Sequence, residues 1–253
     1  MSAPTLSRAL LRLRPARGWT AEYITHQLVA DLFGDRDDRC YLYRTTRERP
    51  GGVEVLVLSG AEPLPPHQLP VRDWGAALNV QSKPFAPALS AGQLLDFEIR
   101  VNATRVVTGP DRKPNGELKK RRHDVWELVW QADKENFEHT PHRTYSEWLA
   151  GQLEGAAELV SPGGVRGEVD GEPLARVTER GEVRARRGDR REAIRFVAAN
   201  LIGTLRVLDP DRFLELVTRG IGREKAFGCG LLCLSRPGTV LPRAYPDAAK
   251  ELY

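Results

Sequence analysis

Apolar and polar residues alternate at the start of the chain, in residues 6–14 (LSRALLRLR). Ala9, Leu11 and Leu13 fall on one face of an extended segment, and three arginines fall on the other. Because successive side chains of a strand point to opposite faces, this spacing predicts a half-buried β-strand with a basic outer face.

The apolar spacing lengthens to three or four residues in residues 20–33 (TAEYITHQLVADLF), which predicts an amphipathic helix. Thr20 stands where a side-chain oxygen can cap the first turn. Tyr23 and His26 lie one turn apart beside the apolar stripe, so they share one surface of the helix. We expect the buried stripe to consist of Ala21, Ile24, Leu28 and Leu32.

Two strand-like runs follow, at residues 40–48 and 52–60, joined by an RPGG turn. A proline-rich connector at 61–70 then precedes residues 75–85, which can supply a fourth strand. The first part of the chain therefore has the order β-α-β-β, with one further strand after the connector.

The pattern begins again near residue 90, because residues 92–102 (GQLLDFEIRVN) alternate like the first strand. The later elements that we expect are a helix at 144–160, strands at 177–187 and 193–208, a helix at 210–220 and a strand at 230–236. The simplest architecture is an α+β fold of two tandem ferredoxin-like β-α-β-β-α-β units. We place the units at residues 1–90 and 91–236 and expect a flexible, proline-rich tail at 237–253.

Composition alone says little about partners. The chain has 253 residues, of which 41% are hydrophobic, and 38 basic against 34 acidic residues give a net charge of +4. This excess matters because it is clustered, in residues 111–124 and 176–195. In the second cluster Arg184 and Arg186 alternate with small apolar residues, so a hairpin arm can present arginines to phosphates. The alternative is that both clusters are solvated loops.

The cysteines and the hydropathy indicate the compartment. Cys40, Cys229 and Cys233 form no paired framework, and the N-terminus lacks the apolar core of a signal peptide. We therefore expect a cytoplasmic protein. A membrane partner is not expected either, because the chain has no run of about 18 apolar residues. Cys229 and Cys233 have no second Cys or His pair at ligand spacing, so we interpret them as small buried hydrophobes and not as a metal site.

A glycine-rich loop spans residues 220–232 (GIGREKAFGCGLL). Its glycines allow a close backbone approach to an anion. The loop does not fit a Walker motif, because Lys225 precedes Ala226 and the segment before the loop resembles a helix. It is therefore either a tight helix-to-strand turn or a phosphate contact that needs no nucleotide cofactor.

Together, the tandem ferredoxin-like pattern, the Tyr-x-x-His of the first helix and the GIGREKAFGCGLLCL segment resemble the CasE-type family of CRISPR-associated endoribonucleases. Members of this family form crRNA as subunits of the type I-E Cascade complex and are built from RRM-like RAMP domains. The resemblance extends over nearly the whole chain up to about residue 236.

The resemblance implies that His26 is catalytic, with Tyr23 as its neighbour. The substrate is then a CRISPR repeat stem-loop whose own 2′-hydroxyl attacks the phosphate, so neither a metal nor a cofactor is needed, and other Cascade subunits are the protein partners. The residues expected to contact RNA are Gly222, Lys225, Arg184, Arg186, Arg187, Arg190, Arg191, Lys119 and Lys120. Two alternatives remain: a non-catalytic RNA-binding RAMP subunit, and a nucleotide-dependent enzyme that uses the glycine-rich loop.

Overall fold

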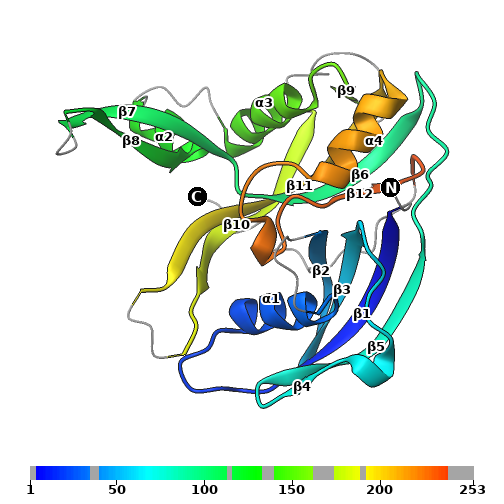
Figure 1. Cartoon of the computed structure of the whole chain (residues 1–253). Coiled ribbons are helices and arrows are strands. Elements are labelled where there is room, and N and C mark those ends of the chain that lie inside the picture. The colour runs from blue at the N-terminus through cyan, green and yellow to red at the C-terminus, as the bar shows by residue number, and fades with distance from the viewer. Residues whose placement is uncertain are drawn as a thin grey trace.

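The computed structural model describes residues 4–34, 40–112, 116–132, 140–161, 174–188 and 192–238. Within these residues the chain forms two larger antiparallel sheets, which lie one after the other in sequence and pack against each other, and a separate two-stranded sheet (Figure 1). Most of the predicted tail, residues 239–253, lies outside the described part of the chain.

The N-terminal sheet has the strand order β2-β3-β1-β5-β4, and its neighbours are antiparallel. Its elements are β1 (Thr5–Leu13), α1 (Ala21–Asp31), β2 (Tyr41–Arg49), β3 (Gly52–Ser59), β4 (Val71–Arg72) and β5 (Gly75–Pro84). The four long strands have the order of a ferredoxin-like sheet. Where such a unit has its second helix, residues 60–74 hold a 3-10 turn, η1 (Pro66–Gln68), and β4. The predicted strands and first helix are confirmed within one or two residues.

Helix α1 packs on one face of this sheet. Ile24, Leu28 and Leu32 are buried, as the apolar stripe predicts, and they belong to the same core cluster as Ala9 and Leu11 of β1. The prediction for Ala21 was wrong, because Ala21 is exposed. It is the first residue of the helix, and there the helix extends beyond its own sheet toward the C-terminal one.

The C-terminal sheet has the order β10-β11-β6-β12, and β9 pairs with the far end of β11. Its elements are β6 (Leu94–Val101), α3 (Pro141–Leu153), β9 (Ala157–Val160), β10 (Ala175–Ala185), β11 (Ile194–Val207), α4 (Pro210–Arg219), η2 (Lys225–Phe227) and β12 (Leu232–Ser235). This is again a ferredoxin-like sheet, in which β9 and β10 share one edge. The α+β fold with two such units is confirmed.

The helix predicted at 144–160 was too long and began too late. It begins after Thr140, whose hydroxyl oxygen accepts a hydrogen bond from the amide of Arg143, and it ends at Leu153. Gly155, with a φ of 76°, breaks the helix, and residues 157–160 pair with β11. Tertiary strand pairing therefore overrides the helical propensity of this segment.

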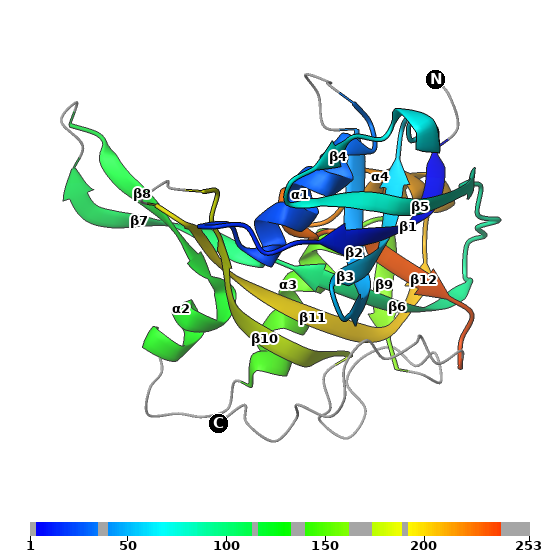
Figure 2. The same ribbon diagram turned by 90° about the horizontal axis from the view of Figure 1, so that it is seen from below.

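A two-stranded arm extends from the C-terminal unit, and the sequence patterns did not predict it. Among the described residues, strands β7 (Thr104–Arg112) and β8 (Leu118–Asp124) pair only with each other. They project away from both larger sheets, and α2 (Val125–Ala132) follows (Figures 1 and 2). We call β7 and β8 the arm. Most of its residues are exposed, so it has few apolar positions from which a pattern can be read.

The two units share one apolar core. Leu42 of β2 and Leu58 of β3 belong to the same buried cluster as Phe97, Trp148 and Ile221 of the C-terminal unit. The second face of the N-terminal sheet is therefore the interface with the C-terminal unit. At this interface the buried guanidinium of Arg44 pairs with Glu98 of β6.

Candidate active site

The first turn of α1 positions both candidate catalytic residues. Thr20 caps the helix, because its Oγ1 accepts the amide of Tyr23 at 3.4 Å. One turn further on, the ring of His26 lies edge-on to Tyr23, with 5.6 Å between centroids and 83° between planes. Both side chains are half-buried. The structure thus brings together the two residues that the sequence singled out.

The glycine-rich loop adds an aromatic side chain that the sequence interpretation missed. Phe227, in η2, has its ring centroid 5.3 Å from that of His26 and 6.3 Å from that of Tyr23. The loop is held on β2, since the Tyr43 hydroxyl donates to the carbonyl oxygen of Ala226 at 3.1 Å. Burial raises the pKa of Tyr43 strongly, so this phenol stays a neutral donor. In the sequence, the only indication that Phe227 belongs to the site was the presence of an aromatic residue inside a glycine-rich loop.

The glycines of this loop fit against the interior of the protein. Gly228 has a φ of 77°, and a Cβ there would lie 3.3 Å from the ring of Tyr43. Gly222 is enclosed in the same way, with Trp148 3.2 Å from a hypothetical Cβ. Lys225 donates from Nζ to the carbonyl oxygen of Arg219, at the end of α4, over 2.7 Å. The loop runs from helix α4 to strand β12, as expected, and forms a tight helix-to-strand turn. RNA contact by Lys225 and Gly222 stays a prediction.

Burial also explains the chemistry of the cysteines in this region. Cys229 is fully buried within the loop, and its burial raises the thiol pKa to about 12, which keeps the group protonated and unreactive. Cys233 is partly buried in β12, and burial raises its thiol pKa too. Both are free thiols, as is Cys40.

The arginines at the end of β10 have different environments. Arg184 is exposed and pairs with Glu182 at 3.0 Å, and Arg187 is exposed as well. Arg186 instead donates from Nε to the carbonyl oxygen of Gly18, at 3.0 Å, just before α1. The two remaining candidates, Arg190 and Arg191, lie outside the described residues.

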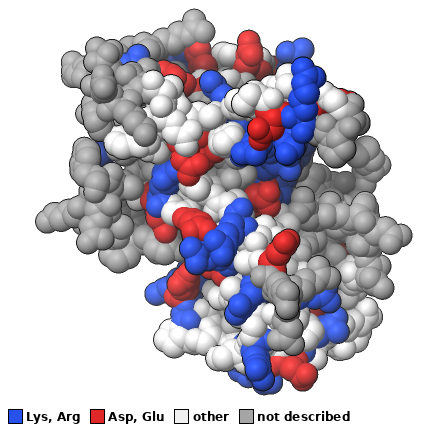
Figure 3. All heavy atoms as spheres, turned by 90° about the vertical axis from the view of Figure 1, so that its left-hand side faces the viewer, with Lys and Arg blue, Asp and Glu red and all other residues white. Residues whose placement is uncertain are grey.

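Lys119 and Lys120 are exposed on β8 of the arm. Figure 3 shows this side of the molecule, with Lys and Arg atoms gathered along the arm at its upper right and a second group near the centre. Acidic atoms are interspersed with the second group. Lys119, Lys120, Arg184 and Arg187 are thus exposed to solvent, and the arm carries the first two on a paired hairpin.

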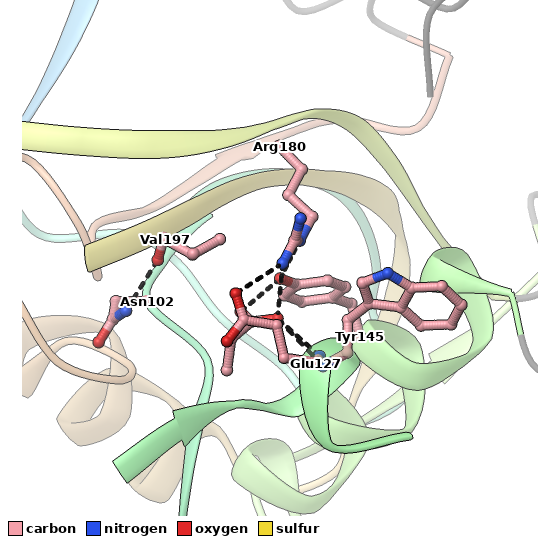
Figure 4. Close-up of polar contacts among 7 residues, drawn as sticks. Asn102, Glu127, Tyr145, Arg180 and Val197 are labelled. Carbon is pink, nitrogen blue, oxygen red and sulfur yellow. Dashed lines mark hydrogen bonds and ion pairs between the residues drawn. The ribbon is translucent and has the colours of Figure 1, made fainter. Parts of the chain in front are cut away.

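A buried polar network fixes the root of the arm. The carboxylate of Asp124, the last residue of β8, accepts a hydrogen bond of 2.6 Å from the Tyr145 hydroxyl and one of 3.1 Å from the Arg180 guanidinium. Arg180 reaches from β10 to Tyr145 and lies 3.6 Å from Glu127 of α2 (Figure 4). Burial and the neighbouring Asp124 raise the pKa of Tyr145. The arm is therefore anchored to α2, α3 and β10 through one carboxylate.

A cavity of about 300 Å³ lies beside the first turn of α1, between the two units. The first turn of α1 forms one wall, with Ala21, Glu22 and Thr25, and Phe227 and Gly228 form part of another. Arg44 and Arg100 line it together with several carboxylates. Phe227 therefore lines this cavity and also packs against the ring of His26.

Known proteins share this architecture. The family model described as CRISPR associated protein matches residues 6–236. The chain is 26% identical, over 226 residues, to the CRISPR system Cascade subunit CasE of Escherichia coli (strain K12), covering 87% of this chain and 95% of that protein. It is 30% identical, over 186 residues, to the CRISPR-associated endoribonuclease Cse3 of Thermus thermophilus, covering 72% of each.

Solved structures agree in fold. Thermus thermophilus Cse3 bound to an RNA representing a pre-cleavage complex aligns with a TM-score of 0.60 and 22% identity, over 92% of this chain and all of that one. The Cas6e protein of Escherichia coli K-12 aligns with a TM-score of 0.55 and 21% identity, over 91% of this chain and 99% of that one.

The fold and the site define a class of α+β protein with two ferredoxin-like units and a histidine–tyrosine pair at their junction. The family match covers most of the chain. The chain belongs to the CRISPR-associated protein family, and the resemblance to its CasE-type members is confirmed.

None of the helices within the described segments is both long and apolar enough to cross a membrane.

Proposed function

We propose that the chain is an endoribonuclease that binds the stem-loop of CRISPR repeat RNA and cuts precursor crRNA, then stays as a subunit of a Cascade complex. The observation that carries this proposal is the pairing of His26 and Tyr23 where the catalytic helix meets the glycine-rich loop. The names of the CasE and Cse3 relatives support both the activity and the assembly.

The reaction uses a nucleophile that RNA supplies. A base removes the proton of the 2′-hydroxyl, the 2′-oxygen bonds to the adjacent phosphorus, and the bond from phosphorus to the 5′-oxygen breaks as that oxygen takes up a proton. The products are a 2′,3′-cyclic phosphate and a 5′-hydroxyl. An imidazole exchanges protons near neutral pH, so His26 serves as base or acid, and the Tyr23 hydroxyl orients it or bonds a phosphate oxygen.

Binding and catalysis come from different parts of the chain. The N-terminal unit, residues 1–90, carries the catalytic helix, and the C-terminal unit, residues 91–236, carries the basic surfaces and the glycine-rich loop. Lys119 and Lys120 on the arm, Arg184 on β10 and Arg187 just beyond its end are exposed, as phosphate contacts must be. The three free thiols suit a reducing compartment, so we place the reaction in the cytoplasm.

The test is a cleavage assay with purified protein and a synthetic repeat stem-loop. A single cut with the two product ends named above supports the proposal. Tight binding of the same RNA without any cut favours the alternative of a non-catalytic RNA-binding subunit.

A further inference from the structure

The end of β10 and the segment that leads into α1 are joined more closely than their exposed positions suggest. The amide of Thr20 donates to the carbonyl oxygen of Arg186 at 3.1 Å, and the amide of Arg186 donates to Thr20 Oγ1, also at 3.1 Å. The same Oγ1 caps the helix by accepting the amide of Tyr23. One hydroxyl therefore serves both the helix that carries the catalytic pair and the strand that leads into the basic segment.

Two glycines allow this approach. Gly18 has a φ of 78°, and a Cβ there would lie 2.4 Å from the carbonyl oxygen of Gly188. Gly188 has a φ of 52° and faces the indole of Trp19, whose Nε1 would lie 3.3 Å from a Cβ. The two backbone segments can touch only because neither position carries a side chain.

Trp19 extends the contact to the catalytic pair. Its ring stacks on Trp74 with 4.6 Å between centroids and 17° between planes, and it meets Tyr23 edge-on at 5.5 Å. A continuous set of contacts therefore runs from Gly188 through Trp19 and Tyr23 to His26. Each step is a packing contact with an aromatic ring, so we expect a displacement at one end to reach the other.

We propose that residues 186–188 and Thr20 form a positioning element, which holds the first turn of α1 so that Tyr23 and His26 face the scissile phosphate. We call this set the clasp. The proposal rests on the proposed ribonuclease function. Arg187 lies within the same segment. The clasp therefore fixes the position of RNA bound at the basic end of β10 relative to Tyr23 and His26.

The informative change is Thr20→Val, which keeps the shape of the side chain and removes the hydroxyl that joins the two segments. In single-turnover reactions at saturating repeat RNA, we expect the rate to fall at least about tenfold, because small misplacements of catalytic groups are costly. The dissociation constant should change less than about twofold, because the phosphate contacts remain. Thr20→Ser should restore the rate.

The control acts on the same helix at its other end. Arg72 holds Asp31, the last residue of α1, through two hydrogen bonds of 2.8 and 3.0 Å. Arg72→Ala loosens that end and should leave the cleavage rate unchanged. Wild-type cleavage by Thr20→Val at saturating RNA, or an equal loss in Arg72→Ala, overturns the clasp as a positioning element.

A second pair of variants tests the clasp through the backbone. Gly188→Ala pushes a methyl group toward Trp19, whereas Gly51→Ala adds one at a φ of 74° with nothing within 4 Å. Both carry the strain of a positive φ, so only the clasp predicts a larger loss of cleavage in Gly188→Ala. Equal losses in the two variants count against it.

A readout independent of activity separates this inference from the proposed function. Hydrogen exchange at the amides of residues 23 and 24 should be faster in Thr20→Val than in wild type or Thr20→Ser. If the wild-type protein does not cut RNA, the proposed function is wrong. If hydrogen exchange is also unchanged in Thr20→Val, the proposal that the clasp positions α1 is wrong as well. Faster exchange confirms that the hydroxyl holds the first turn of α1.

Discussion

The ring centroids of Phe227 and His26 lie 5.3 Å apart, although the two residues come from opposite ends of the chain. The contact depends on the tight turn between α4 and β12 and on the bond from the Tyr43 hydroxyl to Ala226. The C-terminal unit therefore contributes a side chain to the candidate site on the N-terminal unit.

This contact predicts that Phe227→Ala slows cleavage, because the imidazole of His26 loses the surface that limits its rotation. We expect the single-turnover rate to fall about tenfold, which corresponds to about 1.4 kcal/mol of transition-state stabilisation. Phe227→Tyr keeps the ring and is the matched control, with a rate close to wild type. Equal rates for Phe227→Ala and wild type would show that the packing has no part in catalysis.

Substituting the catalytic pair should separate chemistry from binding. His26→Ala is expected to lower the single-turnover rate by about 10²- to 10⁴-fold, the usual contribution of general acid–base groups. RNA affinity should be nearly unchanged, because the interface is dominated by charge. Tyr23→Phe should have a smaller effect, and Gln27→Ala, on the same helix, should have none. Cutting by His26→Ala at the wild-type rate would mean that another residue moves the protons.

The arm and the end of β10 should contribute separately to RNA affinity. Replacing Lys119 and Lys120 by alanine, or Arg184 and Arg187, removes cations that release counterions when they meet phosphates. The slope of log K against log salt should then become shallower by about 0.9 for each duplex phosphate that the variant no longer neutralises. Arg8→Ala removes an exposed arginine on the N-terminal sheet and serves as the control. If a double variant has an unchanged slope, that segment does not contact RNA.

The network at the root of the arm predicts a difference in stability. Asp124→Asn keeps a cap for α2, since asparagine also caps helices, but it removes the carboxylate that accepts from the buried Tyr145 hydroxyl and leaves Arg180 with the carboxylate of Glu127 alone, 3.6 Å away. We expect the free energy of unfolding in urea to fall by about 1–3 kcal/mol. Asp111→Asn breaks an exposed pair with Arg121 and should cost less than about 1 kcal/mol. Similar losses in both variants would show that the network adds no more than a surface ion pair.

Much of the fold follows from local patterns in the sequence. Period-two alternation predicted β1 and β6, and an apolar stripe predicted α1, because each of these elements buries one face against a single core. The arm could not be predicted in this way, since β7 and β8 bury little and are held mainly by pairing with each other. β9 was hidden for a different reason, because its strand state comes from pairing with distant β11.

The candidate site could be predicted only in part from the sequence. Tyr23 and His26 share a helix, so their spacing alone placed them together, and the family resemblance supplied their roles. The sequence analysis missed Phe227, Gly18 and Gly188. The role of each depends on contacts with a segment far away in sequence. Arg186 was grouped with the other arginines by charge, although its guanidinium bonds to the carbonyl oxygen of Gly18.

In the proposed reaction, the RNA supplies its own nucleophile to a site built around His26. The most direct test replaces the nucleotide immediately 5′ of the cut with its 2′-deoxy form and follows the RNA under single-turnover conditions. We expect this RNA to bind as tightly as the all-ribose form, since every phosphate remains, and not to be cut. Cleavage of the deoxy-substituted RNA at the same position would contradict the account, because the attacking oxygen would then have to come from elsewhere.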